Sequence, residues 1–81
     1  MHYDHKNSGV CSTMVHFDID DDKKVRNVSF DGGCNGNLKA IARLVEGKDA
    51  AEVRDILLGN TCGMRPTSCA DQFARAIEEV L

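Results

Sequence analysis

The apolar residues of this chain change their spacing once, next to Gly32 and Gly33. Between Val15 and Phe30 several fall at alternate positions with polar residues between them, which is typical of strands with one buried face. From Leu38 onward they recur three and four positions apart, which is typical of helices. A chain of 81 residues has room for one small domain. The sequence therefore predicts an α+β fold, with an N-terminal antiparallel β-hairpin or small sheet packed on three α-helices.

Two strands are predicted, over residues 11–19 and 25–30. Val25 is out of phase with Val28 and Phe30, so we expect either a β-bulge near Arg26 and Asn27 or a strand that begins after Val25. Residues 1–9 are polar and show no apolar period. They are predicted to form a flexible arm, and the domain is predicted to span residues 10–81.

Three helices are predicted after the hairpin. The first carries an apolar stripe from Leu38 to Val45 and stops at Gly47. The second begins at the N-cap Asp49, has its apolar stripe on Val53, Ile56 and Leu57, and ends near Gly59. The third begins at Ser68, with Asp71 three residues later, and its stripe consists of Phe73, Ile77, Val80 and Leu81.

Charge and hydropathy exclude several classes of function. Ten Lys and Arg against thirteen Asp and Glu give a formal net charge of −3, which argues against a domain that binds nucleic-acid phosphates. No apolar stretch approaches the roughly 20 residues needed to span a bilayer, so no membrane association is expected. The first residues lack the hydrophobic core of a signal peptide, and we expect a cytoplasmic protein.

The four cysteines are the strongest candidates in the chain for metal binding or chemical reactivity. In a reducing compartment, Cys11, Cys34, Cys62 and Cys69 are better read as metal ligands or reactive thiols than as two disulfides. The hairpin predicts that Cys11, at the start of one strand, lies near Cys34, after the end of the next. The first helix then runs away for about 18 Å and the second returns antiparallel to it. The loop with Cys62 and the helix that begins near Cys69 should therefore lie at the same end as the first two cysteines.

Convergence of four cysteines predicts a closed tetrahedral site, and zinc is the metal that such sites usually hold. With only four aromatic residues, the core is small and a metal would add to its stability. Four residues next to these cysteines are candidates to support the ligands: Gly33, Asn35, Thr67 and Asp71.

Other readings of the same residues remain open. The cysteines could be independent buried or surface thiols, or Cys62 and Cys69 could form a disulfide or a thiol redox pair. The glycine-rich segment 32–37 could hold an anion at the start of the first helix, although it matches no nucleotide-binding fingerprint. We expect solvated side chains without a ligand at the histidines and at the acidic turn, that is, at His2, His5, His16, Asp20, Asp21 and Asp22.

Several short segments together resemble the TSCPD-domain family. They are Gly9-Val10-Cys11-Ser12, the stretch from Gly32 to Leu38, Cys62-Gly63, and Thr67-Ser68-Cys69-Ala70-Asp71-Gln72. Ala70 stands where the family name has proline. The family is similar to the C-terminal region of adenosylcobalamin-dependent ribonucleoside-diphosphate reductases and also occurs as small free-standing proteins.

The resemblance implies an accessory module linked to nucleotide metabolism and DNA synthesis, with a ribonucleotide reductase or another protein of nucleotide metabolism as its partner. The chain is too small to enclose a cobalamin domain and a substrate site, so it is expected not to be catalytic alone. Any enzyme label, such as ribonucleoside-diphosphate reductase, would come only from the resemblance.

A more distant likeness is to iron–sulfur scaffold proteins of the IscU and NifU type. It rests on the hairpin, the Gly-Cys pair before a helix, Glu46-Gly47-Lys48 between helices and the cysteine that begins the last helix. There three cysteines would correspond to Cys11, Cys34 and Cys69. This likeness implies an IscU-like fold and, as the alternative function, assembly or carriage of an iron–sulfur cluster.

Overall fold

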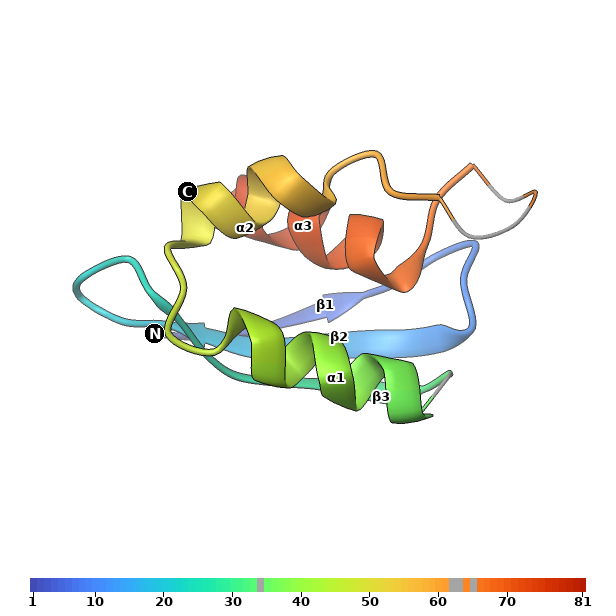
Figure 1. Ribbon diagram of the computed structural model, residues 1–81, viewed down its shortest axis with the longest axis horizontal. Coiled ribbons are helices and arrows are strands. Elements are labelled where there is room, and N and C mark those ends of the chain that lie inside the picture. The colour runs from blue at the N-terminus through green and yellow to red at the C-terminus, as the bar shows by residue number, and fades with distance from the viewer. Residues whose placement is uncertain (34, 62–63, 65) are drawn as a thin grey trace.

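The computed structural model describes residues 1–33, 35–61, 64 and 66–81, which form a three-stranded sheet followed by three helices (Figure 1). The strands are β1 (His2–Lys6), β2 (Ser12–Ile19) and β3 (Val25–Gly32), paired antiparallel in the order β1-β2-β3. The helices are α1 (Asn35–Val45), α2 (Ala50–Leu57) and α3 (Cys69–Val80). The predicted α+β class, with an N-terminal antiparallel sheet and three helices, is confirmed.

Strand β1 corrects the prediction of a flexible arm over residues 1–9. His2 pairs with Asp18 and Lys6 with Met14, so the whole of β1 lies along β2. The N-terminal ammonium also donates a hydrogen bond to the carbonyl of Ile19, at 2.7 Å. The hairpin predicted from apolar spacing is therefore the inner part of a sheet in which β1 is the edge strand next to β2.

The predicted bulge is present in β3. The register passes from His16 opposite Ser29 to Asp18 opposite Arg26, which leaves one extra residue on β3. Asn27 has a φ of +54°, and its backbone N–H donates to a carboxylate oxygen of Glu46 at 2.8 Å. The bulge brings Val25 and Val28 onto the same buried face, because it absorbs the phase error between them.

Local signals set the boundaries of the helices as predicted. The Asp49 carboxylate accepts a hydrogen bond from the Glu52 backbone N–H, and the Ser68 hydroxyl accepts one from the Asp71 backbone N–H. Gly47, which follows α1, has a φ of +77°, a conformation that costs glycine little. These caps satisfy backbone donors that the first turn of a helix leaves unpaired.

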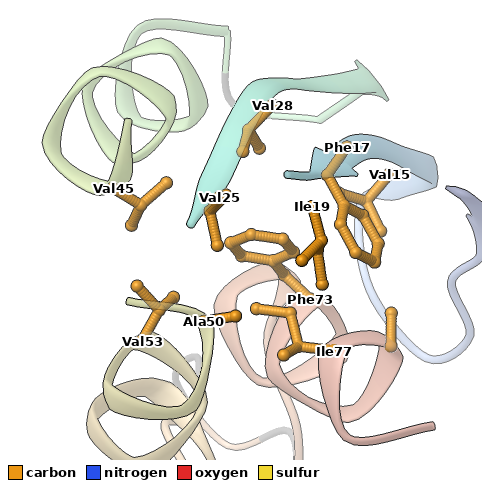
Figure 2. Packing of buried hydrophobic residues seen from close by; sticks show 11 residues of the cluster. Val15, Phe17, Ile19, Val25, Val28, Val45, Ala50, Val53, Phe73 and Ile77 are labelled. Carbon is orange, nitrogen blue, oxygen red and sulfur yellow. The ribbon is translucent and has the colours of Figure 1, made fainter. Parts of the chain in front are cut away.

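The core lies between one face of the sheet and the three helices. Figure 2 shows side chains from all three helices directed toward the same sheet residues. Phe73 of α3 is fully buried and packs edge-on against Phe17 of β2, with ring centroids 5.3 Å apart. Ile56, which the sequence predicts on the buried stripe of α2, is instead 69% exposed. Within the described part of the chain, no helix has the length and apolar character needed to cross a bilayer.

Candidate functional site

At one end of the domain the β1–β2 connection, the end of β3 and the start of α3 come together (Figure 1), and two of the predicted ligands belong to these segments. Cys11 is exposed and directly precedes β2, and Cys69 is half-buried as the first residue of α3. The other two predicted ligands, Cys34 and Cys62, lie outside the described residues.

Ser12 is the residue on which three segments of this end meet. Its side chain is buried, and its hydroxyl donates to Cys69 Sγ at 2.9 Å and accepts from the Asn7 side-chain amide at 2.8 Å. A Cβ atom added to Gly33 would lie 3.1 Å from the Ser12 backbone nitrogen, and the φ of Gly33 is +78°. Hence the β1–β2 connection, the residue after β3 and the start of α3 are all in close contact around Ser12.

A second contact ties the loop before α3 to the same helix start. The Ser68 hydroxyl donates to the backbone carbonyl of Asn60, and the Asn60 side-chain amide lies 3.3 Å from the Ser68 hydroxyl oxygen. Asn60 stands two positions before Cys62, and Ser68 directly precedes Cys69. Hydrogen bonds therefore join Asn60 and Ser68, at the two ends of this loop, next to Cys69.

Behind Cys69, a buried polar network fixes the first turn of α3. The Thr67 hydroxyl donates to the Asp71 carboxylate, which also accepts from the Gly59 backbone N–H at 2.7 Å and from Arg75 Nε at 3.0 Å. Burial disfavours ionisation of Asp71, but the hydrogen bonds from Thr67 and Gly59 and the charge of Arg75 outweigh it, so the pKa of Asp71 is below its ordinary value. The network positions Cys69 through the backbone that carries it.

The candidate supporting residues take different places in this arrangement. Gly33 lies against Ser12, and Thr67 and Asp71 hydrogen-bond each other behind Cys69. The side chain of Asn35 lies outside the described part of the chain. Their role in supporting metal ligands stays a prediction.

Replacing Asp71 with asparagine should lower the free energy of unfolding at pH 7 by about 1–3 kcal/mol, because Thr67 and Arg75 would face an amide in place of a carboxylate. Because the pKa of Asp71 is lowered in the folded state, its charge stabilises the fold above the unfolded-state pKa of about 3.9. This contribution is lost as the pH falls from there through the folded-state pKa. Chemical denaturation of both proteins between pH 7 and pH 3 measures the difference.

The exposed carboxylate of Asp55 offers a control for this prediction. Its side chain is 69% exposed, so Asp55→Asn should change the free energy of unfolding by no more than about 0.5 kcal/mol at any of these pH values. If the Asp71 variant were as stable as the unchanged protein at pH 7, the proposed role of the buried network would be wrong.

A second group of titratable residues lies on the outer face of the sheet, away from the helices. Five side chains from the three strands form a continuous row, in which carboxylates and imidazoles alternate in the order Asp18, His2, Asp4, His16, Asp31. We call it the His–Asp row. His2 Nδ1 is 2.6 Å from Asp18 and its Nε2 is 2.7 Å from Asp4 Oδ1. His16 Nδ1 is 2.5 Å from that same Asp4 oxygen, and its Nε2 is 2.8 Å from Asp31.

The row perturbs the ionisation of its members. Hydrogen bonds to Asp18 and Asp4 raise the pKa of His2, and hydrogen bonds to Asp4 and Asp31 raise the pKa of His16. The same bonds from His16 and His2 lower the pKa of Asp4. His2 is exposed and His16 lies on the outer face of its strand, as predicted, but each ring also contacts two carboxylates, which the prediction did not include. The pattern His-x-Asp occurs at His2 and again at His16, and it would have indicated the row once residues 2–6 were recognised as a strand.

Comparison with known protein families supports one of the two resemblances. The family model described as the TSCPD domain matches residues 1–81, that is, the whole chain. Comparison with curated proteins and with solved structures gave no significant match. The likeness to IscU and NifU scaffolds is therefore without support. With a family model matched over its full length, and with the Thr67-Ser68-Cys69 segment forming the capped start of α3, the chain belongs to the TSCPD domain family.

Proposed function

We propose that this domain is a small accessory module of the ribonucleotide reductase kind, which binds zinc through Cys11, Cys34, Cys62 and Cys69. The observation that carries the proposal is the set of contacts around Ser12. Its hydroxyl reaches Cys69 Sγ and its backbone lies against Gly33. In the sequence, Cys11 is the neighbour of Ser12 and Cys34 is the neighbour of Gly33. Three of the four proposed ligands therefore belong to, or adjoin, residues that touch one another.

The surrounding groups suit a thiolate site. A hydroxyl that donates to a ligand sulfur, as that of Ser12 does toward Cys69, orients the sulfur and offsets part of its negative charge. Four thiolates complete a tetrahedral shell with no open position, which favours a structural role over catalysis at the metal. Such a site would hold together the segments that meet at this end of the domain.

The module is proposed to act by docking on a larger protein of nucleotide metabolism, in the first place a ribonucleotide reductase. It would have no reductase activity of its own, because the chain cannot enclose both a cobalamin cofactor and a nucleotide substrate. A thiolate site of this kind is kept reduced in the cytoplasm, and that location stays a prediction.

Elemental analysis and an absorption spectrum of anaerobically purified protein test the metal proposal. We expect about one equivalent of zinc in the cysteine site and no visible absorption, since zinc is colourless. A coloured, iron-containing protein would favour cluster assembly instead. Metal-free protein with a reversible Cys62–Cys69 disulfide would favour a thiol redox function.

Two assays test the accessory role. The purified domain with adenosylcobalamin, a ribonucleotide and a dithiol reductant should form no deoxyribonucleotide, and turnover would overturn the proposal of a non-catalytic module. Co-purification of the tagged domain with an adenosylcobalamin-dependent reductase, compared with the same reductase and an unrelated tagged protein, should show specific association. Equal recovery in both samples would contradict docking on the reductase.

A further inference from the structure

The His–Asp row consists of hydrogen-bonded imidazole–carboxylate pairs, and its three central residues also have the donor set of a metal site. Each imidazole is held at its outer nitrogen by one carboxylate: His2 Nδ1 by Asp18 and His16 Nε2 by Asp31. The inner nitrogens, His2 Nε2 and His16 Nδ1, both face a single oxygen of Asp4. The three central residues each offer a ligand atom within 4.8 Å of the others.

The outer carboxylates decide which nitrogen of each ring is available. A neutral imidazole that donates its N–H to an outer carboxylate has its lone pair on the other nitrogen. Because their pKa values are raised, both rings in the protonated form donate to Asp4 and to an outer carboxylate, and the row is then satisfied without a metal. When the rings are neutral and donate to the outer carboxylates, both lone pairs point at the Asp4 oxygen, and a cation there would be held by all three groups. This use of carboxylates to orient the histidine ligands is characteristic of metal sites.

Strand pairing and the core below the sheet restrain the positions of His2, Asp4 and His16. The three central residues come from adjacent strands, and Asp4 stands directly opposite His16 in the β1–β2 register. The rings of His2 and His16 are nearly parallel, with an interplanar angle of 8° and centroids 6.4 Å apart. The neighbours of His16 on β2, Val15 and Phe17, are fully buried in the core, and they anchor the strand below the row.

We propose that His2, Asp4 and His16 bind one divalent transition-metal ion on the outer face of the sheet, with Asp18 and Asp31 as positioning residues. Two imidazoles and one carboxylate suit zinc, cobalt or nickel better than calcium or magnesium, which prefer oxygen ligands. Three protein ligands leave further positions for water or for a group from a partner. This site is separate from the cysteine site, because its side chains leave the sheet on the face opposite the core, whereas Ser12 and Cys69 meet on the core side.

Cobalt(II) is the probe that separates the two sites. Protein that holds a single equivalent of zinc, in the cysteine site, is titrated with Co²⁺ and followed by absorption spectroscopy and by proton NMR of the histidine rings. We expect one Co²⁺ to bind with weak visible bands, without thiolate-to-metal charge transfer, and with paramagnetic shifts on the rings of His2 and His16. A thiolate-to-cobalt charge-transfer band in the absorption spectrum would indicate cysteine ligation and would overturn the proposal. The absence of Co²⁺ binding would also overturn it.

Matched variants test the individual residues. His2→Ala and His16→Ala should each abolish this binding, with the fold checked by far-ultraviolet circular dichroism. Asp31→Asn should weaken it by about 10–100-fold, the usual effect of removing a group that orients a ligand. His5→Ala is the control. His5 also lies on β1, but its side chain points to the opposite face of the sheet from those of His2 and Asp4.

The results distinguish this proposal from the cysteine site. Unchanged Co²⁺ binding in both the His2 and His16 variants would overturn the metal site on the sheet, whatever the metal content of the cysteines. Equal loss of binding in the His5 control would also contradict it, because that residue is not among the proposed ligands. If the anaerobically purified protein contains no metal in the cysteine site and the His–Asp row still binds added Co²⁺, the cysteine proposal fails while this one stands.

Discussion

Replacing Phe73 with alanine should lower the free energy of unfolding by about 3–5 kcal/mol, the usual range for removal of a fully buried aromatic ring. Phe73 packs edge-on against Phe17, with centroids 5.3 Å apart, and against Phe30, at 6.1 Å. It thereby joins α3 to both β2 and β3. Figure 2 shows the Phe73 ring among side chains of these two strands. Urea unfolding followed by circular dichroism measures the change.

An exposed leucine provides the control for the core. Leu44 on α1 is 72% exposed, so Leu44→Ala should change the free energy of unfolding by no more than about 0.5 kcal/mol. A loss of less than about 1 kcal/mol in the Phe73 variant would contradict the packing of α3 on the sheet. A changed slope of unfolding free energy against urea concentration would instead mean that the denatured or native state differs in compactness or that unfolding is not two-state.

The helices could be predicted from the sequence because their signals are local. Asp49 and Ser68 each stand three residues before the acidic residue whose backbone N–H they accept, and Gly47 follows the last turn of α1. A cap acts within one turn, so no knowledge of the tertiary structure is needed to recognise it. The bulge in β3 could be predicted for the same reason, since the phase error between Val25 and Val28 is visible within four residues.

Strand β1 could not be predicted in this way, because its stability comes from its partner. Of its five residues only Tyr3 contributes an aromatic side chain to the core, where it packs at 5.5 Å from Phe17. Its backbone hydrogen bonds are made with residues about 8 to 16 positions away in the sequence, beyond the reach of a periodicity argument. The His–Asp row depends on the pairing of β1 with β2, so it could not be predicted from local spacing either.

The cysteine end depends on both kinds of information. The antiparallel hairpin and the returning helices predict that the β1–β2 connection and the start of α3 meet, and the contact between Ser12 and Cys69 fits this expectation. The sequence offers no comparable signal for Asn7, whose side chain reaches the Ser12 hydroxyl from the far side of the connection. Contacts of this type follow from how a loop is closed, which spacing alone does not specify.

Chelation of the proposed zinc should lower the free energy of unfolding by more than about 5 kcal/mol, because structural zinc in small domains contributes apparent binding free energies of about 10–16 kcal/mol. The core of this domain is small, so most of its stability would depend on the metal. Thermal unfolding with and without a strong chelator measures this contribution. A melting temperature that does not change with chelator would contradict a structural metal.

Cys69→Ser turns this into a test of one ligand. Serine keeps a hydrogen-bonding atom near Ser12 and is tolerated at the start of a helix, so the variant removes the thiolate with little other change. Without chelator the variant should melt well below the unchanged protein, because its metal site has lost a ligand. With chelator the two proteins should melt at nearly the same temperature, since neither then holds the metal. If the variant is less stable by the same amount in both conditions, Cys69 contributes packing and the hydrogen bond with Ser12, and the four-cysteine site loses the ligand that begins α3.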